Sequence, residues 1–123
     1  MSQNAFFTAV AILYAILGIG QLLAPSEFMS GFGVTFNASG DLMARVLGTA
    51  AIALAIIYWA CRDAAPSRLF MAVLYGSLTE KVIQVFLAAK AVNAGVLNST
   101  GWAMVILQLL LAIGFAYFAF GKR

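Results

Sequence analysis

Residues 101–120 read GWAMVILQLLLAIGFAYFAF, a stretch of 20 positions without a single charged side chain. At about 1.5 Å per residue, a helix of this length spans about 30 Å, which is the thickness of the hydrocarbon core of a bilayer. Three other apolar stretches of similar length lie at about 6–24, 42–61 and 69–92. None of the four alternates polar and apolar residues as the strands of a membrane barrel do. The sequence therefore predicts four transmembrane helices.

Composition places the whole chain in lipid. Of its 123 residues, 64% are hydrophobic and only 9% are charged, and the mean hydropathy is +1.02. Soluble domains carry about 25% charged residues to cover their surface. The first apolar stretch has no lysine or arginine before it and is longer than a signal-peptide core, so we expect it to be retained. We predict a single all-α domain over residues 1–123, an integral membrane four-helix bundle.

The basic residues predict how the chain is oriented. With four spans, both termini and the loop between the second and third helices lie on one side of the membrane. That side carries four of the seven basic residues, namely Arg62, Arg68, Lys122 and Arg123. Because cytoplasmic loops are enriched in lysine and arginine, we expect both termini in the cytoplasm. The pI of about 9.4 then reflects charges that flank the membrane, and we expect no nucleic-acid partner.

Several kinds of chemistry are excluded by residue types that the chain lacks. It has no histidine, and Cys61 is its only cysteine. An intramolecular disulfide, a CxxC redox couple, a Cys/His zinc site and haem held by histidine are therefore ruled out. The sequence also shows no nucleophile–base pair and no carboxylate dyad. We expect no metal, no cofactor and no catalytic activity.

The longest loop, residues 25–41, is predicted to lie at the membrane interface. Pro25 should end the first helix, and Ser26 should cap a short turn that Gly31 and Gly33 then break. The apolar residues of this loop are Phe28, Met29, Phe32 and Phe36. Such residues favour an element that lies on the bilayer face, either as a structural lid or as one wall of a ligand pocket.

Small residues predict how the first two spans pack. They recur at helical spacing as Thr8, Ala11, Ala15 and Gly18 in the first span, and as Ala44, Gly48, Ala51 and Ala55 in the second. Because lipid tails are as apolar as leucine, transmembrane helices associate where small residues let their backbones approach closely. We expect these two seams to face each other.

The third span contains polar residues where apolar ones are the rule. Ser77, Glu80, Lys81 and Gln84 follow one another at i, i+3, i+4 and i+7, which places them on one stripe of a helix. Neighbouring helical residues point about 100° apart, so we do not expect Glu80 and Lys81 simply to neutralise each other. Since a charge inside the membrane costs at least about 2.5–3.5 kcal/mol, this stripe should face the bundle interior, a water-filled cavity or another protein.

Counted from the outer helix ends, four polar residues lie within roughly 15 Å of the outer interface, namely Gln21, Arg45, Gln84 and Gln108, and Glu80 lies a little deeper. We therefore expect a polar cluster in the outer half of the bundle. Together with Glu80, Lys81 and Asp41, these residues form the candidate ligand- or partner-binding set. Arg45 is the expected partner of Glu80. Asp41, one turn before Arg45, is the alternative, and Glu80 would then be left to Lys81 through solvent or to a ligand.

Three functional hypotheses fit this cluster. The first is a structural or assembly role, as an internal polar network or a docking surface for another membrane protein. The second is a pocket for an amphiphilic molecule such as a lipid or a quinone, entered under the loop at 25–41. The third is a proton- or cation-coupled transport site at Glu80, working in a homo-oligomer.

The chain resembles DoxX-like and neighbouring small four-helix proteins of the bacterial inner membrane. The likeness covers most of its length and rests on Gly18 and Gly20, Ala24 and Pro25, Phe32 and Gly33, and Arg45 with Gly48. Some of these proteins are accessory subunits of quinone-linked oxidoreductases, so the resemblance implies an accessory role and a place in the bacterial inner membrane. In size and number of spans the chain is also similar to small multidrug resistance transporters. Those rely on a glutamate in their first helix, whereas Glu80 lies in the third, which weighs against transport.

Overall fold

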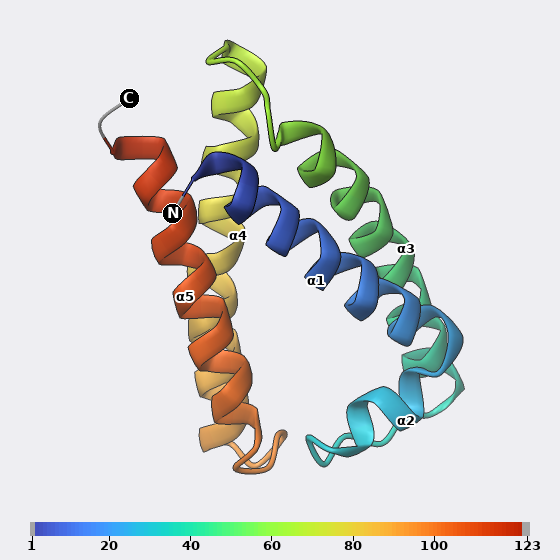
Figure 1. Ribbon diagram of the computed structural model, residues 1–123. Helices are drawn as coiled ribbons and strands as arrows, with labels where there is room; N and C mark the ends of the chain where they lie inside the picture. The colour runs from blue at the N-terminus through green and yellow to red at the C-terminus, as the bar shows by residue number, and fades with distance from the viewer. Residues whose placement is uncertain (1, 122–123) are drawn as a thin grey trace. The chain divides into compact units, whose positions relative to one another are not determined.

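The computed structural model describes residues 2–121 and contains only helices and their connections in that range (Figure 1). The helices are α1 (Gln3–Leu23), α2 (Pro25–Ser30), α3 (Ala38–Cys61), α4 (Arg68–Asn93) and α5 (Gly101–Phe120). All but α2 are long and apolar enough to cross a membrane, so the four predicted helices are confirmed as candidate membrane spans. Lys122 and Arg123, which enter the charge argument, lie outside the described residues. The membrane side of each terminus and the bundle arrangement stay predictions.

The chain packs as two compact units, one ending at Ala64 and the other beginning at Ala65. In the first unit α1 and α3 run side by side in opposite directions, joined through α2 (Figure 1). The second unit is the antiparallel pair α4 and α5. Each unit is therefore a helical hairpin, and each carries part of the candidate set.

Three of the four long helices begin at a side-chain cap. The Ser2 hydroxyl accepts from the Ala5 N–H at 3.1 Å, the Asn37 amide oxygen from Gly40 at 2.7 Å, and the Ser67 hydroxyl from Phe70 at 3.1 Å. These bonds satisfy first-turn N–H groups that have no partner within the helix. The cap at Asn37 starts α3 at Ala38, four residues before the predicted start of the second span near residue 42. The first turn of α3 is polar, so apolar patterning does not reveal it.

The 25–41 loop differs from the prediction in two details. Ser26 does not cap the short helix, because α2 begins at Pro25, after Ala24, without any side-chain cap. Proline is suited to this position, since it has no N–H to satisfy and its φ is already helical. The break falls at Gly33, whose φ of 78° favours glycine, whereas Gly31 keeps a right-handed conformation.

The predicted seam between the first two spans is confirmed. Gly18 and Gly48 meet at the crossing of α1 and α3, where a Cβ built on Gly18 would lie 2.8 Å from the Gly48 carbonyl oxygen. A Cβ on Gly48 would lie 2.7 Å from the Gly18 carbonyl oxygen. Ala11, Ala44 and Ala55 are buried along the same two faces. Only glycine permits this approach, so the crossing fixes how α1 and α3 sit against each other.

Polar side chains also hold the α1–α3 hairpin at both of its ends. At one end, the Gln3 amide nitrogen donates to the carbonyl oxygens of Cys61 (3.0 Å) and Ala64 (2.9 Å). At the other end, Arg45 Nη1 donates to the Leu22 carbonyl oxygen at 2.8 Å. Each of these two end clamps satisfies carbonyls that lie at or just past a helix C-terminus and lack a helical partner. The start of each helix thus binds the end of the other.

Candidate functional site

The polar residues of α4 form a closed hydrogen-bonded triangle, here called the α4 cluster: Glu80, Lys81 and Gln84. The Lys81 ammonium lies 3.0 Å from Glu80 Oε1 and donates to Gln84 Oε1 at 3.2 Å. The Gln84 amide nitrogen donates to Glu80 Oε1 at 3.0 Å. One carboxylate oxygen therefore accepts from two donors, and the cluster has no net charge.

The expectation that Glu80 and Lys81 do not neutralise each other is wrong. It rests on the direction of the Cα–Cβ bonds, which do diverge between neighbouring helical residues. Lysine, however, carries its ammonium on a flexible four-carbon stem, which bends back along the helix surface toward Glu80. Gln84, one turn after Glu80, closes the triangle from the i+4 position.

The α4 cluster lies at the middle of its helix. Lys81 comes 13 residues after Arg68 (81 − 68) and 12 residues before Asn93 (93 − 81). At about 1.5 Å per residue, it is about 18–20 Å from either end of α4. The Lys81 side chain is 2% exposed and that of Glu80 is 32% exposed. A buried ammonium beside a partly exposed carboxylate therefore sits at the depth where charge costs most.

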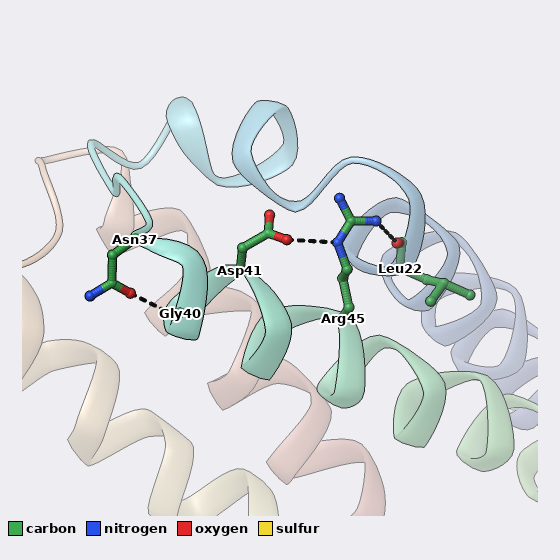
Figure 2. Close-up of polar contacts among 5 residues, drawn as sticks. All are labelled: Leu22, Asn37, Gly40, Asp41 and Arg45. Carbon is green, nitrogen blue, oxygen red and sulfur yellow. Dashed lines mark hydrogen bonds and ion pairs between the residues drawn. The ribbon is translucent and has the colours of Figure 1, made fainter.

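Arg45 and Asp41 form a second polar site near the start of α3 (Figure 2). Arg45 Nε lies 2.8 Å from Asp41 Oδ2, and Nη1 reaches the Leu22 carbonyl oxygen. Both side chains are partly exposed, Arg45 at 42% and Asp41 at 33%. Asp41 lies in the first turn of α3 and Arg45 beside the C-terminus of α1, so each charge also has the sign that complements the neighbouring helix dipole.

The structure thus answers how the charged residues pair. Arg45 binds Asp41, the second of the two partners considered for it, while Glu80 binds Lys81 directly. Arg45 and Glu80 belong to different units, and each forms its ion pair inside its own unit. Opposite charges are matched locally on α3 and on α4.

The two remaining candidate glutamines stay outside both sites. Gln21 lies in the last turn of α1, with its backbone against Gly48. Gln108 lies on α5, and its amide oxygen is buried without a hydrogen-bond partner among the described residues. Five of the seven candidate residues therefore form the two polar sites. Among residues 2–121, no hydrogen bond joins either of these two glutamines to a site.

The sequence does not predict that the Leu22 carbonyl and the Gln3 side chain take part in these contacts. A backbone carbonyl leaves no signal in a sequence. Gln3 lies outside the apolar pattern that defines the first span, so nothing marks it as a partner of Cys61. Asn37 was recognisable, because asparagine directly before a helical pattern is a preferred N-cap.

Arg45 should be required for the stability of the first unit. We expect Arg45→Ala to lower its free energy of unfolding by about 1 kcal/mol, because two charge-assisted hydrogen bonds are lost at a partly exposed site. Arg45→Lys should restore only part of this loss, since an ammonium lacks the planar fork that reaches Asp41 and Leu22 together. Chemical unfolding in a mild detergent, followed by circular dichroism, measures the change. Exposed Arg68→Ala is the control, and an equal loss there would contradict the clamp.

No known protein family, curated protein or solved structure matches this chain. The resemblance to DoxX-like proteins therefore stays an expectation.

Proposed function

We propose that this chain is a non-catalytic accessory subunit of a membrane complex, and that it recognises its partner through the α4 cluster. In this proposal the four spans form a bundle in the bacterial inner membrane with both termini in the cytoplasm, as the basic residues favour. The observation that carries the proposal is the neutral triangle of Glu80, Lys81 and Gln84 at the midpoint of a helix of membrane-spanning length.

The cost of this cluster argues for a purpose beyond crossing the membrane. Each charged residue costs at least about 2.5–3.5 kcal/mol at the centre of a span. Pairing removes the net charge, yet a buried ion pair usually stabilises no more than apolar residues of the same size. The best-attested benefit of such groups is to specify register and partner among packed helices. Side-chain amides such as that of Gln84 also hydrogen-bond across transmembrane helices.

Native mass spectrometry of the protein, extracted gently from its own membrane, tests this proposal. An accessory subunit should be recovered in a larger complex at fixed stoichiometry, which also identifies the partner. Recovery as a lone monomer with a retained lipid or quinone would replace the protein partner by a lipophilic ligand. Recovery as a homo-oligomer without ligand would contradict the accessory role.

Glu80→Gln should weaken folding or assembly. The amide keeps the size of the side chain but leaves the Lys81 ammonium without its anion, which costs up to about 3–5 kcal/mol where the remaining charge is fully buried. The control is Glu27→Gln, which makes the same chemical change at an exposed position outside the long helices. A correctly assembled Glu80→Gln protein of unchanged stability would refute the structural role of the pair.

One observation favours a second function, a cation-coupled transporter working as a homo-oligomer. Glu80 is the more exposed member of its pair, and in this second proposal a proton or a monovalent cation binds its carboxylate in place of the Lys81 ammonium. Transport would then be lost in Glu80→Gln while the protein stays folded. Flux of a monovalent cation into proteoliposomes, measured for both proteins, separates this function from the accessory role.

A further inference from the structure

The Arg45–Asp41 pair keeps unused hydrogen-bonding groups on both of its members. A guanidinium has five N–H donors, and two are used, by Asp41 and by the Leu22 carbonyl. The other three, and Asp41 Oδ1, have no partner among residues 2–121. In Figure 2 the third guanidinium nitrogen and this second carboxylate oxygen point to the same side of the pair. The pair therefore presents donors and an acceptor next to each other.

The pair on α3 lies close to the boundary between the hydrocarbon core and the lipid headgroups. α3 has 24 residues, about 36 Å, so a centred hydrocarbon core of about 30 Å leaves about 3 Å of helix beyond it at each end. Asp41 is in the first turn, about 4.5 Å from Ala38, and Arg45 is one turn further in. Helical side chains lean toward the N-terminus, so the Arg45 guanidinium reaches back to the level of Asp41.

The charges of the pair determine which headgroup fits. Arg45 and Asp41 together are neutral, and the C-terminus of α1 adds partial negative charge beside them. A purely anionic headgroup would bring its charge to Arg45 but would also meet the Asp41 carboxylate. A headgroup that carries a phosphate and a primary ammonium can satisfy both, phosphate on the open edge of Arg45 and ammonium on Asp41 Oδ1. Exposed Leu42 and Val46 lie beside the pair on α3 and offer apolar surface for an acyl chain.

We propose that Arg45 and Asp41 form a binding site for an amino-phospholipid of the phosphatidylethanolamine type. This site is on α3 and does not depend on the α4 cluster, so it stands or falls separately from the accessory role. Phosphatidylcholine carries the same phosphate, but its trimethylammonium group has no N–H to donate to Asp41. Phosphatidylglycerol has the phosphate and no cation. The predicted order of binding is therefore ethanolamine first, with choline and glycerol headgroups behind.

Competition between these three lipids tests the site. The delipidated protein in detergent is mixed with equal amounts of phosphatidylethanolamine, phosphatidylcholine and phosphatidylglycerol of identical acyl chains, and retained lipid is counted by native mass spectrometry. We expect the ethanolamine lipid to be retained roughly threefold more often than either competitor, as one partly exposed charge-assisted contact allows. Equal retention of all three, or a preference for phosphatidylglycerol, would overturn the proposal.

Asp41→Asn shows whether the pair is responsible. Asparagine still offers Arg45 an amide oxygen, so the clamp on Leu22 stays in place while the carboxylate that binds the ammonium is lost. The preference for the ethanolamine lipid over phosphatidylcholine should disappear, whereas exposed Asp63→Asn should keep it. A preference that survives Asp41→Asn in a folded protein would place the lipid elsewhere. The same spectra report the oligomeric state, so loss of lipid selectivity and loss of assembly are read independently.

Discussion

Gly48→Leu should prevent the α1–α3 hairpin from folding. A Cβ at this position would lie 2.7 Å from the Gly18 carbonyl oxygen and 2.8 Å from the Leu22 nitrogen. Both obstacles are backbone atoms, so no side-chain rotation relieves them. We expect a loss of stability at or above the upper end of the roughly 1–3 kcal/mol typical of overpacked cores. Titration with denaturing detergent, followed by circular dichroism, measures the free energy of unfolding.

Gly76→Leu is the matched control for this experiment. It makes the same substitution in another helix of membrane-spanning length, at an exposed position where an added Cβ would meet nothing within 4 Å. Leucine is a better helix former than glycine by up to about 1 kcal/mol, so this variant should be as stable as the parent or slightly more stable. Equal losses in both variants would mean that the close approach of Gly18 and Gly48 does not decide the fold of the hairpin.

Lys81→Met should also destabilise the second unit. Methionine fills a similar volume, but the Glu80 carboxylate then loses the ammonium that neutralises it near the middle of a span. Breaking a buried ion pair from one side costs up to about 3–5 kcal/mol, and the loss here should fall below that limit because the remaining Glu80 carboxylate is 32% exposed. Lys90→Met, in the exposed last turn of α4, should change stability little. The free energy of unfolding in detergent is again the measurement.

The double variant Glu80→Gln, Lys81→Met separates charge imbalance from packing. With both charges removed, the amide introduced at position 80 and the amide of Gln84 can hydrogen-bond to each other along the helix, so stability should return close to that of the parent. A double variant as unstable as the sum of its single changes would show that the two residues do not act as a pair. The coupling energy from this cycle therefore measures the pair directly.

The four spans could be predicted from the sequence because long apolar stretches have few alternatives in lipid. The predicted limits of the spans are close to those of α1, α4 and α5. The error at α3 has a clear cause: its first turn contains Ser39, Gly40 and Asp41, and a search for apolar residues passes over a polar turn. Asn37 carries the missing signal, since its side chain caps the helix there.

The sequence predicted which residues belong to the candidate sites, but only some of the contacts between them. Helical spacing correctly groups Glu80, Lys81 and Gln84, and the i, i+4 relation correctly offers Asp41 to Arg45. The direct contact of Lys81 with Glu80 was missed, because the direction of a Cβ does not limit a long flexible side chain. The bond from Arg45 to Leu22 was missed for another reason, since its acceptor belongs to the backbone.

The two end clamps set an order in which the first hairpin can form. The bond from Arg45 to Leu22 closes a separation of 23 residues, whereas the bonds from Gln3 span 58 and 61 residues. Closing a loop costs more as it grows, by roughly 0.6 kcal/mol for each doubling. The hairpin should therefore form first beside α2 and last at its open end. The Gly18–Gly48 crossing should form between these two steps. Its last bond waits for Ala64, the final residue of the unit, so the first hairpin can be complete without any residue of α4.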